Sequence, residues 1–127
     1  MKIIATKQDL DEALSQERAL IFFWVNYAIQ ARYAEILVRH LLVSWLDEHA
    51  SCQVSAYRVD ISEPNSNGWE TVREWLHAEK VTSQVSDSGS LFWVKSGKVA
   101  LSVKYVLQYD DRKLLAVSES VFAPDLW

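Results

Sequence analysis

Short apolar runs alternate with amphipathic stretches along the chain. The run ALIFFWV at 19–25 is apolar throughout, which is typical of a strand covered on both faces of a sheet. Residues 2–5, 52–61 and 91–106 are rich in β-forming residues, and the last stretch is interrupted by Ser96 and Gly97, a hairpin-turn signal. The pattern therefore predicts about five strands, the last two forming a closing antiparallel hairpin.

Between these strands, apolar residues recur at helical spacing. Helices are expected at 7–17, 28–50, 69–80 and 110–122, which gives the order β-α-β-α-β-α-β-β-α. The first helix has Thr6 as its cap, three residues before Asp9. In the long helix we expect one stripe to face the core, formed by Ile29, Tyr33, Leu37, Leu41 and Trp45 and widened by Ile36 and His40. The chain is expected to be a single domain, residues 1–127, with a core at 2–122 and a C-terminal tail at 123–127.

Composition and charge exclude several classes of protein. Of the 127 residues, 50% are hydrophobic and 24% charged, the balance of one soluble globular domain. The net charge of −4, without a basic run, argues against binding to nucleic acid or to a membrane surface. The longest mostly apolar stretch, 37–46, is too short to span a membrane, and the N-terminal residues lack a signal-peptide core. A cytoplasmic protein is expected.

The candidate chemistry is sparse. Cys52 is the only cysteine, which excludes an internal disulfide and a multi-cysteine zinc site, and we expect it to be buried and inert. His40, His49 and His77 lack the spacing of a ligand motif, so no metal is expected. No phosphate-binding glycine pattern and no nucleophile elbow occurs, and no cofactor is expected.

The order of elements is that of the thioredoxin fold, and three segments carry the resemblance. ALIFFWVNYAIQARYAEI at 19–36 resembles the family's strand, redox turn and helix, usually written FWAxWCxxCK. YRVDISEP at 57–64 and LFWVKSGKVA at 91–100 resemble two further family segments. The likeness extends over about residues 2–122. It implies an α/β, thioredoxin-like fold with a central mixed sheet of about five strands flanked by about four helices.

The departures from the family pattern remove its chemistry. The cysteines of the redox turn correspond to Ala28 and Ala31, and a buried acid of the preceding strand corresponds to Phe22. The cis-proline that faces the dithiol corresponds to Gly89, counted back from Gly97. Thiol–disulfide exchange needs one thiol to attack and a second to resolve the mixed disulfide, so a dithiol mechanism is not expected.

The resemblance also implies a shallow groove that receives an extended segment of a partner protein. Its candidate residues are Trp24, Tyr27, Ala28, Ile29, Gln30, Ala31, Ser88 and Gly89. The hypothesis is a redox-inactive protein that acts through protein–protein contact, as an adaptor, chaperone or regulator, rather than an oxidoreductase. Three alternatives stay open: Trp24 and Tyr27 are ordinary packing residues; the chain is an enzyme of this fold that uses other chemistry or Cys52 alone; or it is an oligomer-forming structural subunit, for example a homodimer.

Overall fold

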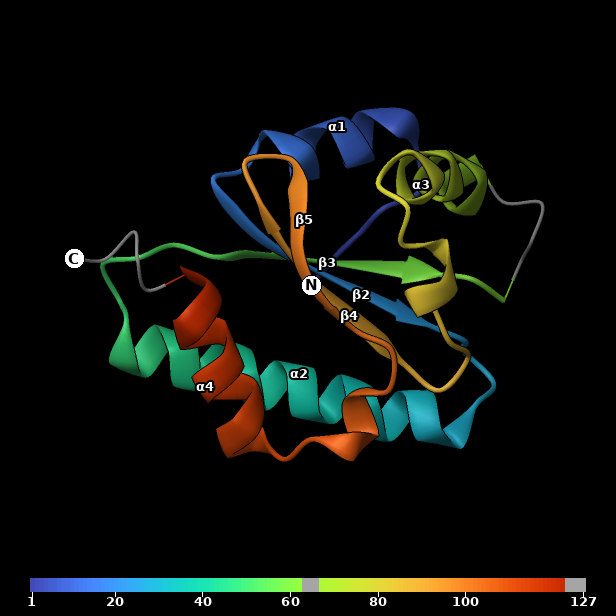
Figure 1. The fold of residues 1–127 in the computed structure, drawn as a ribbon. Coiled ribbons are helices and arrows are strands. Elements are labelled where there is room, and N and C mark those ends of the chain that lie inside the picture. Colours follow the sequence, from blue (N-terminus) through green and yellow to red (C-terminus); the bar gives the residue numbers. More distant parts are fainter. Residues whose placement is uncertain (63–66, 123–127) are drawn as a thin grey trace.

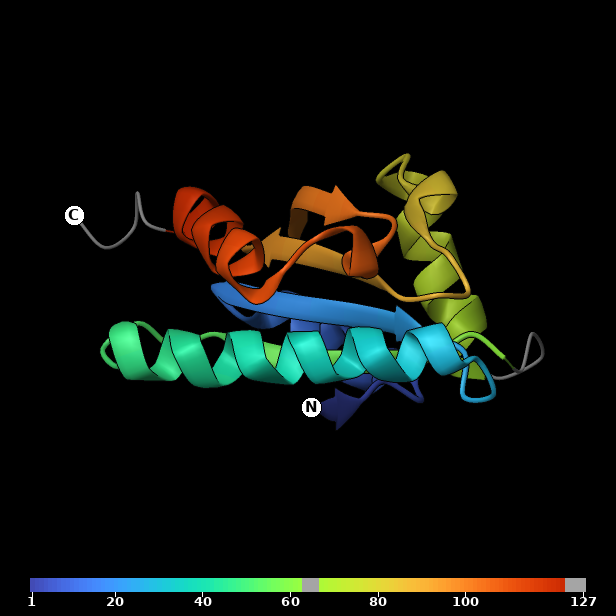
Figure 2. The same cartoon turned by 90° about the horizontal axis from the view of Figure 1, so that it is seen from below.

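One five-stranded sheet lies between two layers of helices (Figures 1 and 2). The computed structural model describes residues 1–62 and 67–122. The strands, in spatial order, are β1 (Lys2–Ile3), β3 (Ser55–Asp60), β2 (Arg18–Trp24), β4 (Ser90–Lys95) and β5 (Lys98–Val103). The helices are α1 (Lys7–Ser15), α2 (Ile29–Glu48), α3 (Asn67–Ala78) and α4 (Asp111–Phe122), with short 3₁₀ turns η1 (Thr82–Gln84) and η2 (Val106–Gln108). The expected order of elements is the observed one.

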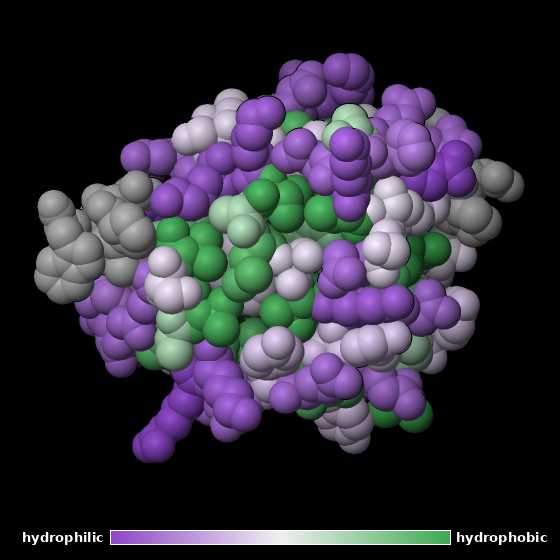
Figure 3. Space-filling model, viewed as in Figure 1, coloured by the Kyte–Doolittle hydropathy of each residue, from purple (hydrophilic) through white to green (hydrophobic). Residues whose placement is uncertain are grey.

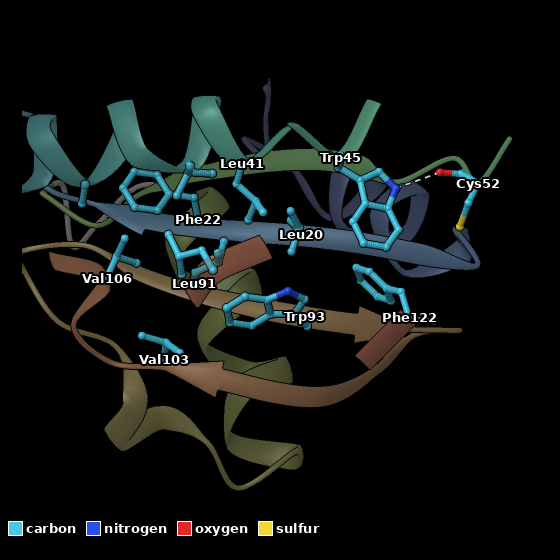
Figure 4. Packing of buried hydrophobic residues seen from close by; sticks show 13 residues of the cluster. Leu20, Phe22, Leu41, Trp45, Cys52, Leu91, Trp93, Val103, Val106 and Phe122 are labelled. Carbon is cyan, nitrogen blue, oxygen red and sulfur yellow. Dashed lines mark hydrogen bonds between the residues drawn. The ribbon is translucent and has the colours of Figure 1, made fainter. Parts of the chain in front are cut away.

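The central strand β2 is buried on both faces, as its apolar run predicted. It pairs in parallel with β3 and antiparallel with β4. Because successive side chains of a strand point to opposite faces, Leu20 and Phe22 pack on the α2 and α4 side, whereas Ile21 and Phe23 pack on the α1 and α3 side. Figure 4 shows the first of these clusters, with Trp93 of β4 between β2 and the end of α4.

The turn and cap signals of the sequence are confirmed. Thr6 caps α1, and its hydroxyl accepts a hydrogen bond from the Asp9 main-chain NH while the Asp9 carboxylate accepts one from the Thr6 NH. Asp110 caps α4 by accepting from the NH of Lys113 at 2.8 Å. Between β4 and β5, Ser96 and Gly97 have φ angles of 50° and 83°, the left-handed values that a two-residue hairpin turn requires.

One expected element boundary differs in the structure, and two expected segments lie at least partly outside the described residues. β3 begins at Ser55 rather than at Cys52, because the Cys52 NH instead hydrogen-bonds to the His49 carbonyl in the turn after α2 (2.9 Å). Part of the expected loop before α3, residues 63–66, and the expected tail 123–127 lie outside the part that the structure describes. No helix among the described residues is both long enough and apolar enough to cross a membrane.

The expected core stripe of α2 is wrong over the first half of the helix. The buried residues of α2 are Ala31, Ala34, Val38, Leu41 and Trp45. Four members of the expected stripe are exposed instead: Ile29, Tyr33, Ile36 and His40. The helix has two apolar faces, and packing selects the one that begins with small residues, because the loop at Gly89 approaches within contact distance of Ala34.

Candidate functional site at the turn between β2 and α2

The turn between β2 and α2 displays two large apolar side chains. Val25 is buried, and its carbonyl accepts from the Ala28 NH at 3.1 Å, which closes the turn. The helix then begins, with the Arg32 NH bonded to the Ala28 carbonyl (3.3 Å). Tyr27 and Ile29 flank Ala28 and are 74% and 66% exposed. The turn therefore presents an apolar surface at the end of the sheet where β2 and β3 finish.

Ala28 and Ala31 lie at the N-terminus of α2, where a thiol would be activated. Ala28 is the cap residue and is half-buried, and Ala31 is fully buried in the first turn of the helix. A helix N-terminus lowers the pKa of a cysteine placed there, but a methyl group carries no proton to lose. Cys52 lies near the opposite end of α2, where its carbonyl accepts a hydrogen bond from Trp45 Nε1 at 2.9 Å (Figure 4). Cys52 is 5% exposed, which confirms that it is buried.

Gly89 holds the loop before β4 against the start of α2. Its φ angle is +111°, and a Cβ built on it would lie 2.6 Å from the Cβ of Ala34 and 3.2 Å from Cε1 of Phe22. Its carbonyl accepts from the Val106 NH at 3.1 Å. No peptide bond in the described ranges is cis. Proline cannot adopt a positive φ, so this loop follows a path that excludes proline at position 89.

A set of serine hydrogen bonds fixes the same loop but leaves the main-chain groups of two residues without partners among the described residues. The Ser86 NH donates to Ser90 Oγ (2.7 Å), and both hydroxyls donate to the Lys104 carbonyl, at 2.7 and 2.9 Å. Ser88 is half-buried, and its hydroxyl lies 3.3 Å from that of Ser86. The main-chain NH and carbonyl of Ser88 form no hydrogen bond with the residues that the structure describes. The same holds for the main-chain groups of Asp87, whereas the Gly89 NH donates to the Ser86 carbonyl at 3.5 Å.

Trp24, the last residue of β2, is partly covered by a neighbouring side chain. The residue is half-buried, and the Arg58 guanidinium lies 4.6 Å from the centre of its ring. Arg58 also pairs with Glu35 at 3.5 Å, and Glu35 pairs with Arg39 at 2.8 Å. The indole NH of Trp24 is buried and has no hydrogen-bond partner within the described ranges. One face of the ring is thus covered by a cation.

The eight candidate residues therefore fall into two groups. Tyr27, Ile29 and Gln30 are exposed on the turn and the start of α2, and Ser88 and Ala28 are half-buried. Trp24 is also half-buried, whereas Ala31 and Gly89 are buried packing residues. The first group forms the surface that a partner can reach.

Sequence reasoning missed Tyr105 and Leu107, which flank the same loop. Both are exposed: Tyr105 precedes and Leu107 lies in η2, the short orange helix that follows β5 and lies beside the first half of α2 in Figures 1 and 2. The bond from Val106 to Gly89 ties η2 to the site, and Lys104 Nζ lies 5.6 Å from the centre of the Tyr105 ring. The only sequence signal was an apolar segment that continued the hairpin pattern, which favoured a strand.

One group of possible metal ligands occurs far from this turn. Glu48, His49 and Glu119 place one ligand atom each within 4.8 Å of the others, where α2 ends beside α4. His49 Nε2 lies 3.0 Å from Glu119 Oε2, and its ring packs on Trp45 with 4.3 Å between centroids. An ion pair and ring packing account for these positions.

The fold is similar to that of solved thioredoxins. Thioredoxin O2 from Arabidopsis thaliana in the oxidized state has a TM-score of 0.62 and 17% identity, covering 95% of this chain and 93% of that one. The thioredoxin of Fasciola hepatica gives 0.62 and 17%, covering 95% and 99%, and that of Malassezia sympodialis gives 0.65 and 15%, covering 95% and 90%. No protein-family model and no curated protein matches the chain. At these identities the likeness establishes the fold, as the sequence predicted.

Proposed function

We propose that this chain, which has the thioredoxin fold with a single cysteine and no CxxC pair, is a redox-inactive protein that binds an extended segment of a partner protein at the β2–α2 turn. One observation carries the proposal. Tyr27 and Ile29 protrude into solvent on the turn where the resemblance places the reactive sulfur of thioredoxins. The loop that packs against Ala34 of α2 through Gly89 carries Ser88, whose main-chain groups have no partner in the described part of the chain. Exposed apolar groups next to free main-chain groups are what an extended segment requires.

The redox-inactive half of the proposal follows from the thiol inventory. An exchange reaction needs a nucleophilic thiolate and a second thiol that resolves the mixed disulfide. The chain has one cysteine, Cys52, which is buried at the other end of α2 from Ala28 and Ala31. An unpaired thiol is typical of a reducing compartment, so the proposal places the protein in the cytoplasm.

The binding half follows from the geometry of the loop. The NH and carbonyl of Ser88 pair with the main chain of the bound segment, as when a strand is added to a sheet edge. Alternate side chains of an extended segment point to opposite sides, so one set packs against Tyr27 and Ile29 and the other toward Tyr105. The surface is small and mostly apolar, so we expect a segment with hydrophobic residues at alternate positions and an affinity of about micromolar strength.

Selection of peptides from a random displayed library tests the proposal. Selected peptides are expected to be extended and apolar at alternate positions, and their affinity is measured by fluorescence anisotropy. The double variant Tyr27→Ala, Ile29→Ala should weaken binding at least about tenfold. The matched control is Leu101→Ala, an apolar truncation on β5 at the edge of the sheet, which should leave the affinity unchanged.

The main-chain contribution has its own test. Methylating single amide nitrogens of a selected peptide should abolish binding at the one position that pairs with Ser88 and leave neighbouring positions unaffected, because only alternate amides of a strand face the same edge. If no peptide is selected, or if the selected peptides bind the Tyr27→Ala, Ile29→Ala variant as well as the parent, the proposed function is wrong.

Introducing cysteines at the turn tests whether the missing thiols alone, or also the residues around them, prevent thiol–disulfide exchange. The double variant Ala28→Cys, Ala31→Cys keeps the spacing of the redox turn, and we expect its disulfide to close. Reduction of insulin should stay slow, because the buried Phe22 cannot accept a proton and Gly89 replaces the proline of thioredoxins. Efficient insulin reduction by this variant would show that only the sulfur atoms had been lost.

A further inference from the structure

The side of α2 that faces away from the sheet carries a row of apolar residues. This outer face is defined here by Tyr33, Ile36, Val43 and Leu46, with Arg32 and Asp47 at its two ends. The four apolar residues are between 50% and 65% exposed. Figure 2 shows α2 running along the surface of the molecule over its full length, with no other described element across its outer side.

The spacing of these residues makes them one surface. Tyr33 and Ile36 are three residues apart, as are Val43 and Leu46, so each pair lies on adjoining turns of the helix. His40 lies between the pairs and is also exposed. The solvent side of a surface helix is ordinarily polar, and single exposed apolar residues need no explanation. A continuous row over about four turns of helix indicates a surface that a partner covers.

The row is symmetric about its own midpoint. Tyr33 and Leu46 lie equally far from a point between Arg39 and His40, and so do Ile36 and Val43. A second copy of α2 turned end over end about that point therefore brings Ile36 against Val43, a contact that occurs twice, and places Tyr33 and Leu46 along the two margins of the contact. Such a self-complementary patch is what a twofold interface requires.

The charges fit the same symmetry. Arg32 and Asp47 are also equidistant from the midpoint, so an antiparallel pair brings each arginine to the aspartate of the other copy, whereas a parallel pair brings like charges together. Asp47 forms no ion pair with the residues described, and Arg32 donates only to the Asn26 carbonyl at 3.3 Å. Arg39, close to the axis, is already paired with Glu35 at 2.8 Å.

We infer that two copies of this chain associate through the outer faces of α2 in antiparallel orientation. The inference uses no residue of the peptide site, since Ile29 lies about 16 Å along the helix from the midpoint, beyond the outer face as defined. The two β2–α2 turns lie at opposite ends of the pair. One helix face covers less than the roughly 800 Å² per partner of a standard interface, so we expect a dissociation constant in the micromolar range.

Sedimentation equilibrium at about 10 to 500 µM protein tests the inference. The parent chain should pass from monomer to dimer, and Ile36→Glu or Val43→Glu should raise the dissociation constant at least about tenfold, since each substitution acts twice in the pair. Both positions are exposed, so circular dichroism and the melting temperature of the monomer should be unchanged. A parent chain that stays monomeric throughout the range, or an Ile36→Glu chain that dimerises as the parent does, would overturn the inference.

The control substitution lies on a second exposed apolar surface, away from α2, that could also form an interface. Figure 3 shows hydrophobic residues gathered between β5 and α4 on the side of the molecule seen there, and Leu101 of β5 is 37% exposed. Leu101→Glu should leave dimerisation unchanged. Dissociation of the dimer by Leu101→Glu, but not by Val43→Glu, would place the interface at the β5 edge and overturn the inference.

Charge exchange tests the orientation. Arg32→Asp alone and Asp47→Arg alone should each weaken the dimer, and the two together should restore it, because the antiparallel pairs are re-formed with reversed sign. Failure of the double variant to restore association would rule out the antiparallel pairing. Tyr27→Ala, Ile29→Ala should still dimerise and Val43→Glu should still bind peptide, so that failure of one proposal is distinguishable from failure of the other.

Discussion

Replacing Gly89 with alanine tests whether the loop before β4 is held against α2 as the structure shows. Two independent penalties are expected. The φ angle of +111° is one that residues with a Cβ rarely adopt. The new Cβ would also lie 2.6 Å from the Cβ of Ala34 and 3.2 Å from the ring of Phe22, distances at which the backbone must move.

The magnitude follows from the two penalties. A non-glycine residue at such a φ costs about 1–3 kcal/mol, and overpacking a close-packed site costs typically about 1–3 kcal/mol. The Gly89→Ala variant should therefore lose about 2–6 kcal/mol of unfolding free energy, against the total of about 5–15 kcal/mol that is usual for a domain. A loss at the upper end would leave the variant only marginally folded at room temperature.

A second substitution separates the two terms. Ala34→Gly removes the methyl group that the new Cβ would meet, and by itself it should cost about 1–2 kcal/mol through helix propensity and the lost buried methyl. In the double variant the overpacking is relieved while the φ penalty remains. The double-mutant cycle should thus give a favourable coupling of about 1–3 kcal/mol between positions 34 and 89.

Urea unfolding monitored by far-ultraviolet circular dichroism measures all four corners of the cycle. The denaturant m-value serves as the control, because an unchanged m-value shows that the surface exposed on unfolding is the same in each variant. A Gly89→Ala variant within about 0.5 kcal/mol of the parent, or a coupling of zero with Ala34→Gly, would refute the close approach of the loop to α2.

Three further predictions concern a buried hydrogen bond in the core, the reactivity of the Cys52 thiol and the loss of folding stability at acid pH. Ser118→Ala should cost about 1–3 kcal/mol in urea unfolding, because the buried Trp93 indole NH donates to Ser118 Oγ at 2.8 Å and would lose its acceptor. Cys52 should react with a disulfide reagent far more slowly in the native protein than in denaturant, since its side chain is buried. The pKa of Asp9 is lowered, first by the hydrogen bond from the Ala5 NH, so its contribution to stability is complete above the unfolded-state pKa and is lost as pH falls through the folded-state value. Asp9→Asn should therefore lose stability less steeply than the parent in acid, measured by unfolding at several pH values.

Each of these predictions has a contrary outcome. A Ser118→Ala variant as stable as the parent would mean that the indole NH finds another acceptor. Rapid native-state modification of Cys52 would revive a redox role for the lone thiol. If the unfolding free energies of the parent and of Asp9→Asn fall equally steeply in acid, the capping carboxylate has the same pKa in the folded and unfolded chains.

The sequence predicted the elements better than it predicted their buried faces. The apolar run around Phe22, the Thr6 cap and the turn at Gly97 are local signals, and each was found where expected. The face of α2 was not a local matter, because the helix is apolar on two sides and periodicity alone favoured Ile29 and Tyr33 for the core. The structure buries Ala31 and Ala34 instead.

The same distinction holds for the candidate site. Ala28 and Ala31 follow from alignment with a known turn, and the absence of a dithiol is fixed by composition alone. The roles of the surrounding residues depend on neighbours far away in the sequence: Arg58 covers Trp24, and Val106 of η2 hydrogen-bonds to Gly89. The spacing of residues within one segment cannot predict contacts of this kind.

What the chain determines by itself is thus its chemistry and its order of elements, since both depend on residue types and on patterns a few residues long. Which of two apolar helix faces meets the sheet is decided only when the chain closes on itself, because close packing favours the small side chains of Ala31 and Ala34 where a loop must pass. That choice leaves Tyr33, Ile36, Val43 and Leu46 in solvent, and with them the surface from which a second copy of the chain is inferred.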